Sequence, residues 1–270
     1  MRIDLSTSLC GALDVTAGML VSIVGAGGKT SLMYCLGREI ARRGEPALLT
    51  TTTKIMYPAT SETVDVVLGE ETQETVSEVR RRLAPGRAVL AGRARLDSKI
   101  AGFSPAFVDA LHNADRAWTV IAECDGARGK SLKVPGDQEP PLAESTDIYV
   151  VVTGADCLGK PLTSQEIFEP EAVARVAGVD LSATVGADVV VKSVVSRDSY
   201  LGRMPPHARC CVFINKIGVE GFEQAGDDSG RSRVTCAFET GLALKSHREV
   251  ERVVYGSLNL GGHGGFLVLR

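Results

Sequence analysis

A glycine-rich turn followed by a lysine and a threonine is the strongest chemical signal in this sequence. Residues 21–31 read Val-Ser-Ile-Val-Gly-Ala-Gly-Gly-Lys-Thr-Ser, which is typical of a buried strand, a tight turn and the start of a helix. Glycines let successive backbone N–H groups curl around an anion, and a helix N-terminus adds positive potential. In such a loop the lysine neutralises terminal phosphates and the hydroxyl holds Mg²⁺. The sequence therefore predicts a nucleotide phosphate site formed by Gly25, Ala26, Gly27, Gly28, Lys29, Thr30 and Ser31.

The spacing of this loop separates it from two better-known patterns. The usual phosphate loop, Gly-x₄-Gly-Lys-[Ser/Thr], requires glycine at position 23, where Ile23 stands. The shorter Gly-x-x-Gly-Lys-Thr resembles the loop of the Mur ligases and folylpolyglutamate synthetase. A dinucleotide fingerprint would need glycine instead of Thr30 and an acid after the second strand, so NAD is disfavoured. An NADP-dependent enzyme stays a less favoured alternative, because the threonines and lysine at 50–54 could contact a 2′-phosphate.

Two acidic residues follow the apolar run at residues 118–122. Glu123 and Asp125 stand just beyond this predicted strand, and alternation places them on the same side if the strand continues. A carboxylate in this position can hold Mg²⁺ or orient an attacking water. The candidate catalytic residues are Lys29, Glu123 and Asp125, and the candidate metal ligands are Thr30, Glu123 and Asp125.

Further polar residues follow two of the predicted strands. Parallel strands bring their carboxyl ends to one edge of a sheet, where ligands bind. Thr51, Thr52 and Thr53 could therefore contact a terminal phosphate there, and Lys54 could bind an anion. The cations that follow the acidic strand end predict a loop that closes over an anion: Arg128, Lys130 and Lys133.

The elements that must position these residues alternate between strand and helix. Apolar, β-rich runs predict strands at 19–24, 47–51, 87–91, 118–122, 147–153, 189–191, 211–214 and 266–269. Helical patterns lie at 28–43, 72–83, 105–112 and 238–244. Continuous apolar strands alternating with helices predict an α/β fold like that of P-loop NTPases, with a mostly parallel sheet and helices on both faces. We expect a single nucleotide-binding domain over residues 1–270, with a mobile loop at 218–233.

Several motifs in fixed order resemble one family. They are Gly25-Ala-Gly-Gly-Lys-Thr30, the run at 50–54, Glu123-x-Asp125-Gly126, Lys133-x-Pro135 with Glu139-Pro140, Gly154-x-Asp156-x-Leu158-Gly159-Lys160-Pro161-Leu162, and Asn215-Lys216. Over residues 8–216 the chain resembles the YqeC family, accessory proteins of selenium-dependent molybdenum hydroxylases. The resemblance implies a nucleotide-binding protein associated with insertion or maturation of a selenium cofactor.

The resemblance also places Asn215 and Lys216 in a nucleotide base pocket, with one departure. Members of the family tend to carry Asn-Lys-x-Asp, whose acid pairs with guanine, whereas this chain has Asn215-Lys216-Ile217-Gly218. Glu220 could replace that acid only if the loop is rearranged. Both ATP and GTP therefore stay open as the nucleotide.

Composition excludes several other classes of protein. The chain has 270 residues, a net charge of −3 and 44% hydrophobic residues, which is ordinary for a globular protein. The chain contains no run of 18 apolar residues, so no membrane span is predicted. Its slight net negative charge argues against nucleic acid as a partner. Seven cysteines without a Cys-x-x-Cys pair indicate the cytoplasm.

Two functional hypotheses follow from these observations. The first is a Mg²⁺-dependent protein that binds and hydrolyses ATP or GTP and serves a selenium-dependent molybdenum hydroxylase. The second is a nucleotide-gated delivery factor that docks on the hydroxylase and has little turnover of its own. In both, the partners are a nucleotide and the hydroxylase or its cofactor.

Overall fold

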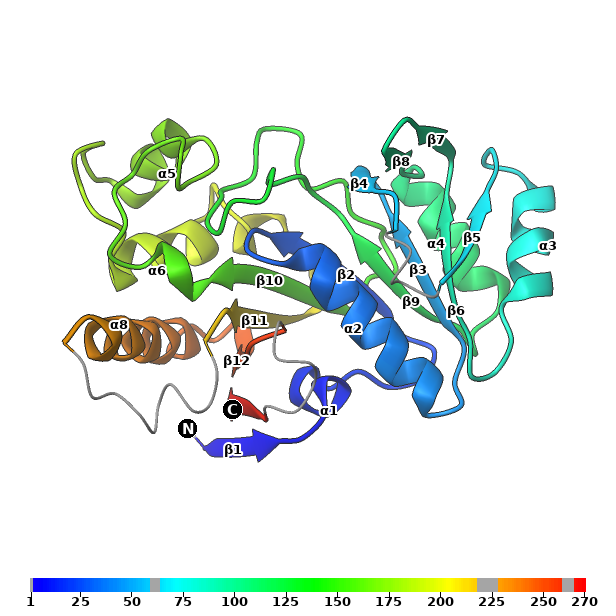
Figure 1. Ribbon diagram of the computed structural model, residues 1–270, viewed down its shortest axis with the longest axis horizontal. Coiled ribbons are helices and arrows are strands. Elements are labelled where there is room, and N and C mark those ends of the chain that lie inside the picture. Colours follow the sequence, from blue (N-terminus) through cyan, green and yellow to red (C-terminus); the bar gives the residue numbers. More distant parts are fainter. Residues whose placement is uncertain (1, 59–63, 218–227, 259–264) are drawn as a thin grey trace.

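The computed structural model describes residues 2–58, 64–217, 228–258 and 265–270, and its centre is one ten-stranded sheet (Figure 1). From edge to edge the strands are β1 (Ile3–Ser6), β13 (Phe266–Leu269), β12 (Val250–Tyr255), β11 (Arg209–Asn215), β10 (Ile148–Gly154), β2 (Leu20–Gly25), β9 (Thr119–Glu123), β3 (Ala47–Thr51), β6 (Ala88–Gly92) and β5 (Asp65–Leu68). The eight strands from β12 to β5 are parallel, and β13 runs antiparallel to both of its neighbours.

Helices cover both faces of this sheet. One face packs against α1 (Leu9–Leu13) and α2 (Lys29–Arg42). The other packs against α3 (Gln73–Arg82), α4 (Pro105–Ala114), α5 (Pro170–Ala177), α6 (Ala187–Val195) and α8 (Asp228–Lys245), and short 3₁₀ turns lie at Ala155–Cys157 and Leu201–Arg203. Strand residues alternate between the two cores: in β2, Val21 and Ile23 face α2, whereas Leu20 and Val24 face the opposite core. The predicted α/β class, mostly parallel with helices on both faces, is confirmed.

A small antiparallel sheet extends from the carboxyl end of β3. Its strands are β4 (Lys54–Met56), β8 (Lys99–Ala101) and β7 (Ala94–Leu96), in that order. The backbone after β8 is fixed to the end of β3, because Gly102 N–H donates to Thr53 O (2.6 Å) and Phe103 N–H donates to Thr51 O (2.9 Å). Figure 1 shows this small sheet and the long loop between β9 and β10 above the same side of the large sheet.

One prediction about elements is wrong, and a second is wrong in its last part. Residues 189–191 were expected to form a strand, but they lie in the helix α6. The expected loop at 218–233 includes residues 228–233, which belong to α8, while residues 218–227 lie outside the described part of the chain.

Within the described residues, no helix combines the length and apolarity needed to cross a bilayer.

Candidate functional site

The turn between β2 and α2 is held by β10 and by Asp125, which follows the end of β9. Gly25 and Gly27 have φ values of 93° and 91°. The Gly25 N–H donates to Asp125 Oδ2 (3.0 Å), and the Ala26 N–H donates to Val152 O on β10 (2.9 Å). These bonds occupy the N–H groups of Gly25 and Ala26, two of the predicted phosphate contacts, and Gly27 and Gly28 are the glycines of the turn that line the cavity described below.

At two positions of this turn, neighbouring atoms lie so close to the backbone that only glycine fits. A Cβ on Gly27 would lie 2.4 Å from the backbone nitrogen of Gly154, at the end of β10. A Cβ on Gly28, whose φ is 127°, would lie 2.3 Å from Nδ2 of Asn215. Asn215 itself is buried and donates from Nδ2 to Gly27 O (2.7 Å), while its Oδ1 accepts from the Leu258 N–H (3.3 Å). The carboxyl ends of β10 and β11 thus brace the loop.

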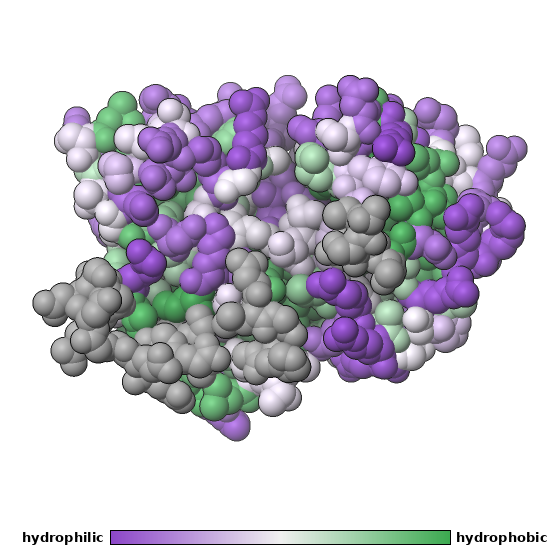
Figure 2. Space-filling model, viewed as in Figure 1, coloured by the Kyte–Doolittle hydropathy of each residue, from purple (hydrophilic) through white to green (hydrophobic). Residues whose placement is uncertain are grey.

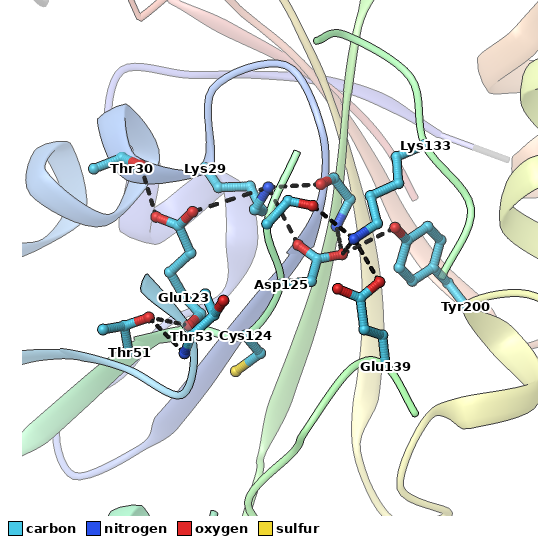
Figure 3. Close-up of polar contacts among 12 residues, drawn as sticks. Lys29, Thr30, Thr51, Thr53, Glu123, Cys124, Asp125, Lys133, Glu139 and Tyr200 are labelled. Atoms are coloured by element: carbon cyan, nitrogen blue, oxygen red, sulfur yellow. Dashed lines mark hydrogen bonds and ion pairs between the residues drawn. The ribbon is translucent and has the colours of Figure 1, made fainter. Parts of the chain in front are cut away.

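Lys29 is folded back against the protein and is only 4% exposed. Its Nζ donates to Gly25 O (2.6 Å) and lies 3.2 Å from Asp125 Oδ1 and 3.9 Å from Glu123 Oε1 (Figure 3). A lysine with these partners has to exchange one of them for phosphate oxygens when a nucleotide enters.

Glu123 and Thr30 form the pair best suited to a divalent cation. Thr30 Oγ1 donates to Glu123 Oε2 at 2.7 Å. Mg²⁺ prefers octahedral oxygen ligands at about 2.0–2.1 Å, so adjacent ligands stand about 2.9 Å apart. The residues present therefore fit Mg²⁺ as two of its ligands. Among the described residues, no group of three or more His, Cys, Asp or Glu side chains is arranged to hold a metal, so phosphate oxygens and water would complete the shell.

Asp125 does not share the position of Glu123. β9 ends at Glu123, so the alternation that would place both acids on one side does not continue. The side chain of Asp125 is fully buried: one oxygen faces Lys29, and the other accepts from the Gly25 N–H and the Tyr200 hydroxyl (3.0 Å each). Asp125 therefore holds the loop and its lysine in place, and it is not among the residues that line the cavity described below.

Lys133 extends this buried network away from the loop. Its Nζ donates to Gly126 O (2.6 Å), pairs with Glu139 Oε2 (2.6 Å) and lies 3.8 Å from Asp125 Oδ2. It also stands 5.0 Å from the ring centroid of Phe168. The predicted anion ligand Lys133 is thus already compensated inside the protein.

Burial shifts the protonation of several of these groups. It raises the pKa of the Glu123 carboxyl above its ordinary range, although the Lys29 ammonium and the Thr30 hydroxyl act in the opposite direction. Burial and the adjacent Asp125 raise the pKa of Tyr200 well above its usual value, so its hydroxyl remains a donor. Burial likewise raises the pKa of Cys124 to about 12, which keeps this thiol protonated at neutral pH.

The threonines at the end of β3 hydrogen-bond mainly to backbone carbonyl groups of neighbouring strands. Thr50 Oγ1 donates to Ala91 O (3.0 Å), and Thr51 Oγ1 donates to Glu123 O (2.8 Å). The Thr52 N–H donates to the same Glu123 carbonyl (3.0 Å). Only Thr53 of this group reaches the cavity.

A cavity of about 610 Å³ lies in front of the loop. It contains ten of the predicted site residues: Gly27, Gly28, Lys29, Thr30, Ser31, Thr53, Lys54, Glu123, Arg128 and Lys130. Figure 2 shows hydrophilic side chains along the upper rim of the molecule, over the small sheet and the loops beside it. The volume of the cavity lies in the range of small-molecule sites, and its lining is unusually rich in charged side chains for such a site.

The predicted base-pocket residues lie outside this cavity. Asn215 braces the loop as described, and Lys216 donates to Ser131 Oγ (2.6 Å) and to Asp156 Oδ2 (2.8 Å). Glu220 belongs to the residues that the structure does not describe.

Sequence reasoning missed three residues of this region. Tyr200 lies far along the chain from Asp125 and carries no local motif. Lys99 and Phe168 line the cavity from the small sheet and from the segment before α5. A basic residue in a short alternating segment was the only signal for Lys99, and it is too common to be informative.

Two comparisons with known proteins identify one family, and a third gives a distant structural match. The family model described as YqeC protein matches residues 21–171. The protein of Escherichia coli (strain K12) named "Uncharacterized protein YqeC" is 28% identical over 198 residues, which cover 73% of this chain and 76% of that protein. Among solved structures, FtsY from Mycoplasma mycoides matches 89% of this chain with a TM-score of 0.39 and 10% identity, and the match spans 62% of the FtsY chain.

Proposed function

Because the chain belongs to the YqeC family, we propose that it is a Mg²⁺-dependent protein that binds and hydrolyses ATP or GTP during maturation of a selenium-dependent molybdenum hydroxylase. One observation carries the nucleotide part of this proposal. Gly27 and Gly28 of the turn, Lys29 and the Thr30–Glu123 pair all line a single cavity.

Each residue has a distinct part in this proposal. The amides of Gly27 and Gly28 bind the phosphates, and Lys29 leaves Asp125 to neutralise the terminal ones. Thr30 and Glu123 hold Mg²⁺, which when bound neutralises charge on the phosphate oxygens. Asp125 keeps its bonds to Gly25 and Tyr200 and so preserves the shape of the loop while the lysine moves.

Replacement of the loop lysine tests this function. A hydrogen bond to a charged group contributes about 1.5–3 kcal/mol, so Lys29→Ala should weaken binding of Mg·ATP or Mg·GTP by roughly 10- to 100-fold. Equilibrium binding and turnover of labelled nucleotide measure this effect. Arg81→Ala removes an exposed cation on α3 and is the matched control, for which binding should equal that of the wild type. Equal nucleotide binding by the Lys29 variant and the wild type would refute the proposal.

The burial of Asp125 favours a second candidate, the nucleotide-gated delivery factor. Of the two acids expected to orient a water, Asp125 is enclosed by Lys29, Gly25 and Tyr200, and Glu123 is engaged by Thr30. Binding of nucleotide with negligible turnover would support this candidate. Capture of the hydroxylase by the tagged protein with Mg·AMP-PNP, and none without nucleotide, would support it further, whereas capture independent of nucleotide would oppose it.

A further inference from the structure

We propose that the cavity binds a second, anionic substrate beside the nucleotide, between Lys54 and Lys99 on the small sheet and Arg128 and Lys130 on the loop after β9. This second site rests on the proposed function, because that function fixes where the nucleotide binds in the cavity. It assigns a substrate class: a small molecule that carries carboxylate or other oxyanion groups.

The two lysines of the small sheet share one face. Lys54 pairs with Ala101 and Met56 pairs with Lys99 across β4 and β8, so Lys54 and Lys99 are diagonal neighbours on the same side. Both are exposed and both line the cavity. In the described part of the chain neither has a salt-bridge partner. Two like charges at this spacing repel each other, and an anion between them would remove that cost.

The opposite wall presents Arg128 from a strained turn. Arg128 and Gly129 have φ values of 46° and 77°, and the Lys130 N–H donates to Ala127 O (2.9 Å), which closes a turn with both central residues in the left-handed region. This position favours Asn, Asp or Gly, and a residue such as arginine pays about 1 kcal/mol to occupy it. The Arg128 guanidinium lies 5.7 Å from the centroid of the Phe168 ring and is exposed. The side chain, and not the backbone, therefore explains why arginine stands here.

The order of strands separates these cations from the phosphate loop. Along the sheet, β2 carries the loop, β9 carries Glu123, and β3 leads into the small sheet. Thr30 and Glu123 mark the metal site, so the terminal phosphate lies on the β9 side of the loop. Lys54 and Lys99 stand one strand further on, beyond that phosphate.

The cavity also has more positively charged side chains than the phosphate loop needs to bind a nucleotide. The lining has five cations and two carboxylates. Glu139 is paired with Lys133, and in the proposed nucleotide complex Lys29 faces the terminal phosphates. Lys54, Lys99, Arg128 and Lys130 then remain without a carboxylate partner in the described residues, since Lys130 Nζ donates to the neutral Gln165 carbonyl. Their combined positive charge would attract an anion beside the phosphates of the proposed nucleotide.

Titration of the nucleotide-loaded protein tests this site. Citrate and inorganic phosphate are the probes, added to full-length protein saturated with Mg·AMP-PNP and followed by calorimetry. We expect Lys54→Ala and Lys99→Ala each to weaken citrate binding about 5- to 10-fold and to leave AMP-PNP affinity within 2-fold of the wild type. Arg128→Asn should weaken citrate binding similarly while unfolding at the same or a higher urea concentration, because asparagine suits the left-handed turn.

A control lies on the same small sheet. Arg95 pairs with Ile100 and so faces the side opposite Lys99. Arg95→Ala removes one cation from the sheet and should bind both probes as the wild type does. Absence of probe binding by the wild type, or equal binding by all variants, would overturn the second site. Parallel loss of citrate and AMP-PNP in the lysine variants would also overturn it, since the lysines would then serve the nucleotide.

The proposed function fails separately. If the wild type binds neither Mg·AMP-PNP nor Mg·GMP-PNP, the nucleotide proposal is refuted, and the same titration is then read on the nucleotide-free protein. Citrate binding that depends on Lys54 and Lys99 would support the anion site in that case, and binding independent of them would overturn it.

Discussion

At the scale of single residues, two acids close in sequence have different tasks. Glu123 meets the Thr30 hydroxyl at the edge of the cavity, and Asp125 lies under the loop among Lys29, Gly25 and Tyr200. The sequence could predict Lys29, Thr30 and Glu123, because a strand, a glycine turn and a helix start are local signals. It could not distinguish Asp125 from Glu123, since the distinction depends on the strand ending between them and on a tyrosine from another segment.

Replacement of Glu123, the carboxylate of the Thr30–Glu123 pair, tests whether its burial lowers the free energy of unfolding. Burial raises the pKa of this carboxyl above its ordinary 4.5, so between 4.5 and the raised value the folded state holds a proton that the unfolded state releases. Stability therefore falls as the pH rises through this window. Glu123→Gln removes that cost and should stabilise the nucleotide-free protein by about 1 kcal/mol at pH 7, with the advantage lost below pH 4.5. Urea unfolding between pH 4 and 8 measures it.

The same variant should bind Mg·AMP-PNP more weakly, because a carboxylate ligand is gone. Glu144→Gln, an exposed carboxylate on the loop before β10, should change neither property. A Glu123 variant that is less stable than the wild type at neutral pH would show that the carboxylate stabilises the fold.

At the scale of elements, strands that do not carry the loop determine its shape. The end of β10 leaves no room for a side chain at position 27, and Asn215 at the end of β11 donates to the Gly27 carbonyl. The asparagine that the family resemblance places in a base pocket is, in this structure, a brace behind the phosphate loop.

An isosteric change isolates this brace. Asn215→Asp keeps an acceptor for the Leu258 N–H but removes the donor to Gly27 O and places a charge beside it. A buried group left without its partner costs about 1–3 kcal/mol, and the loosened loop should lose nucleotide affinity as well. Urea unfolding and AMP-PNP titration measure the two effects. Asn113→Asp, on the exposed end of α4, is the control, and wild-type stability of the Asn215 variant would contradict the brace.

The wrong prediction for residues 189–191 has a physical cause. Three consecutive valines favour a strand, because β-branched side chains fit a pleated surface. In α6 the buried residues are Val189, Val190, Ser193 and Val194, a helical spacing that packs against α5 and α8. Short apolar runs do not distinguish the two structures, so tertiary packing decided this one.

At the scale of the whole molecule, the direction of chain winding changes at β2. The chain passes from β2 to β3, β5 and β6 on one side, returns through β9, and then adds β10, β11 and β12 on the other. Ligands of parallel α/β sheets bind outside the carboxyl ends of the strands where the winding reverses, and the cavity lies there. Periodicity could predict parallel strands with helices on both faces, because the strands are continuously apolar. It could not predict their order, which depends on contacts between distant segments.

The sheet also constrains how the protein is made. β1 hydrogen-bonds only to β13 within the described sheet, and β13 joins it to β12. β1 (Ile3–Ser6) is translated long before β13 (Phe266–Leu269), the strand that pairs with it. Ile3 and Leu5 are 50% and 70% exposed even when paired, so the waiting segment presents apolar side chains and open backbone groups throughout elongation. Between the translation of β1 and that of β13, this segment therefore has the unpaired, apolar edge that favours aggregation of incomplete chains.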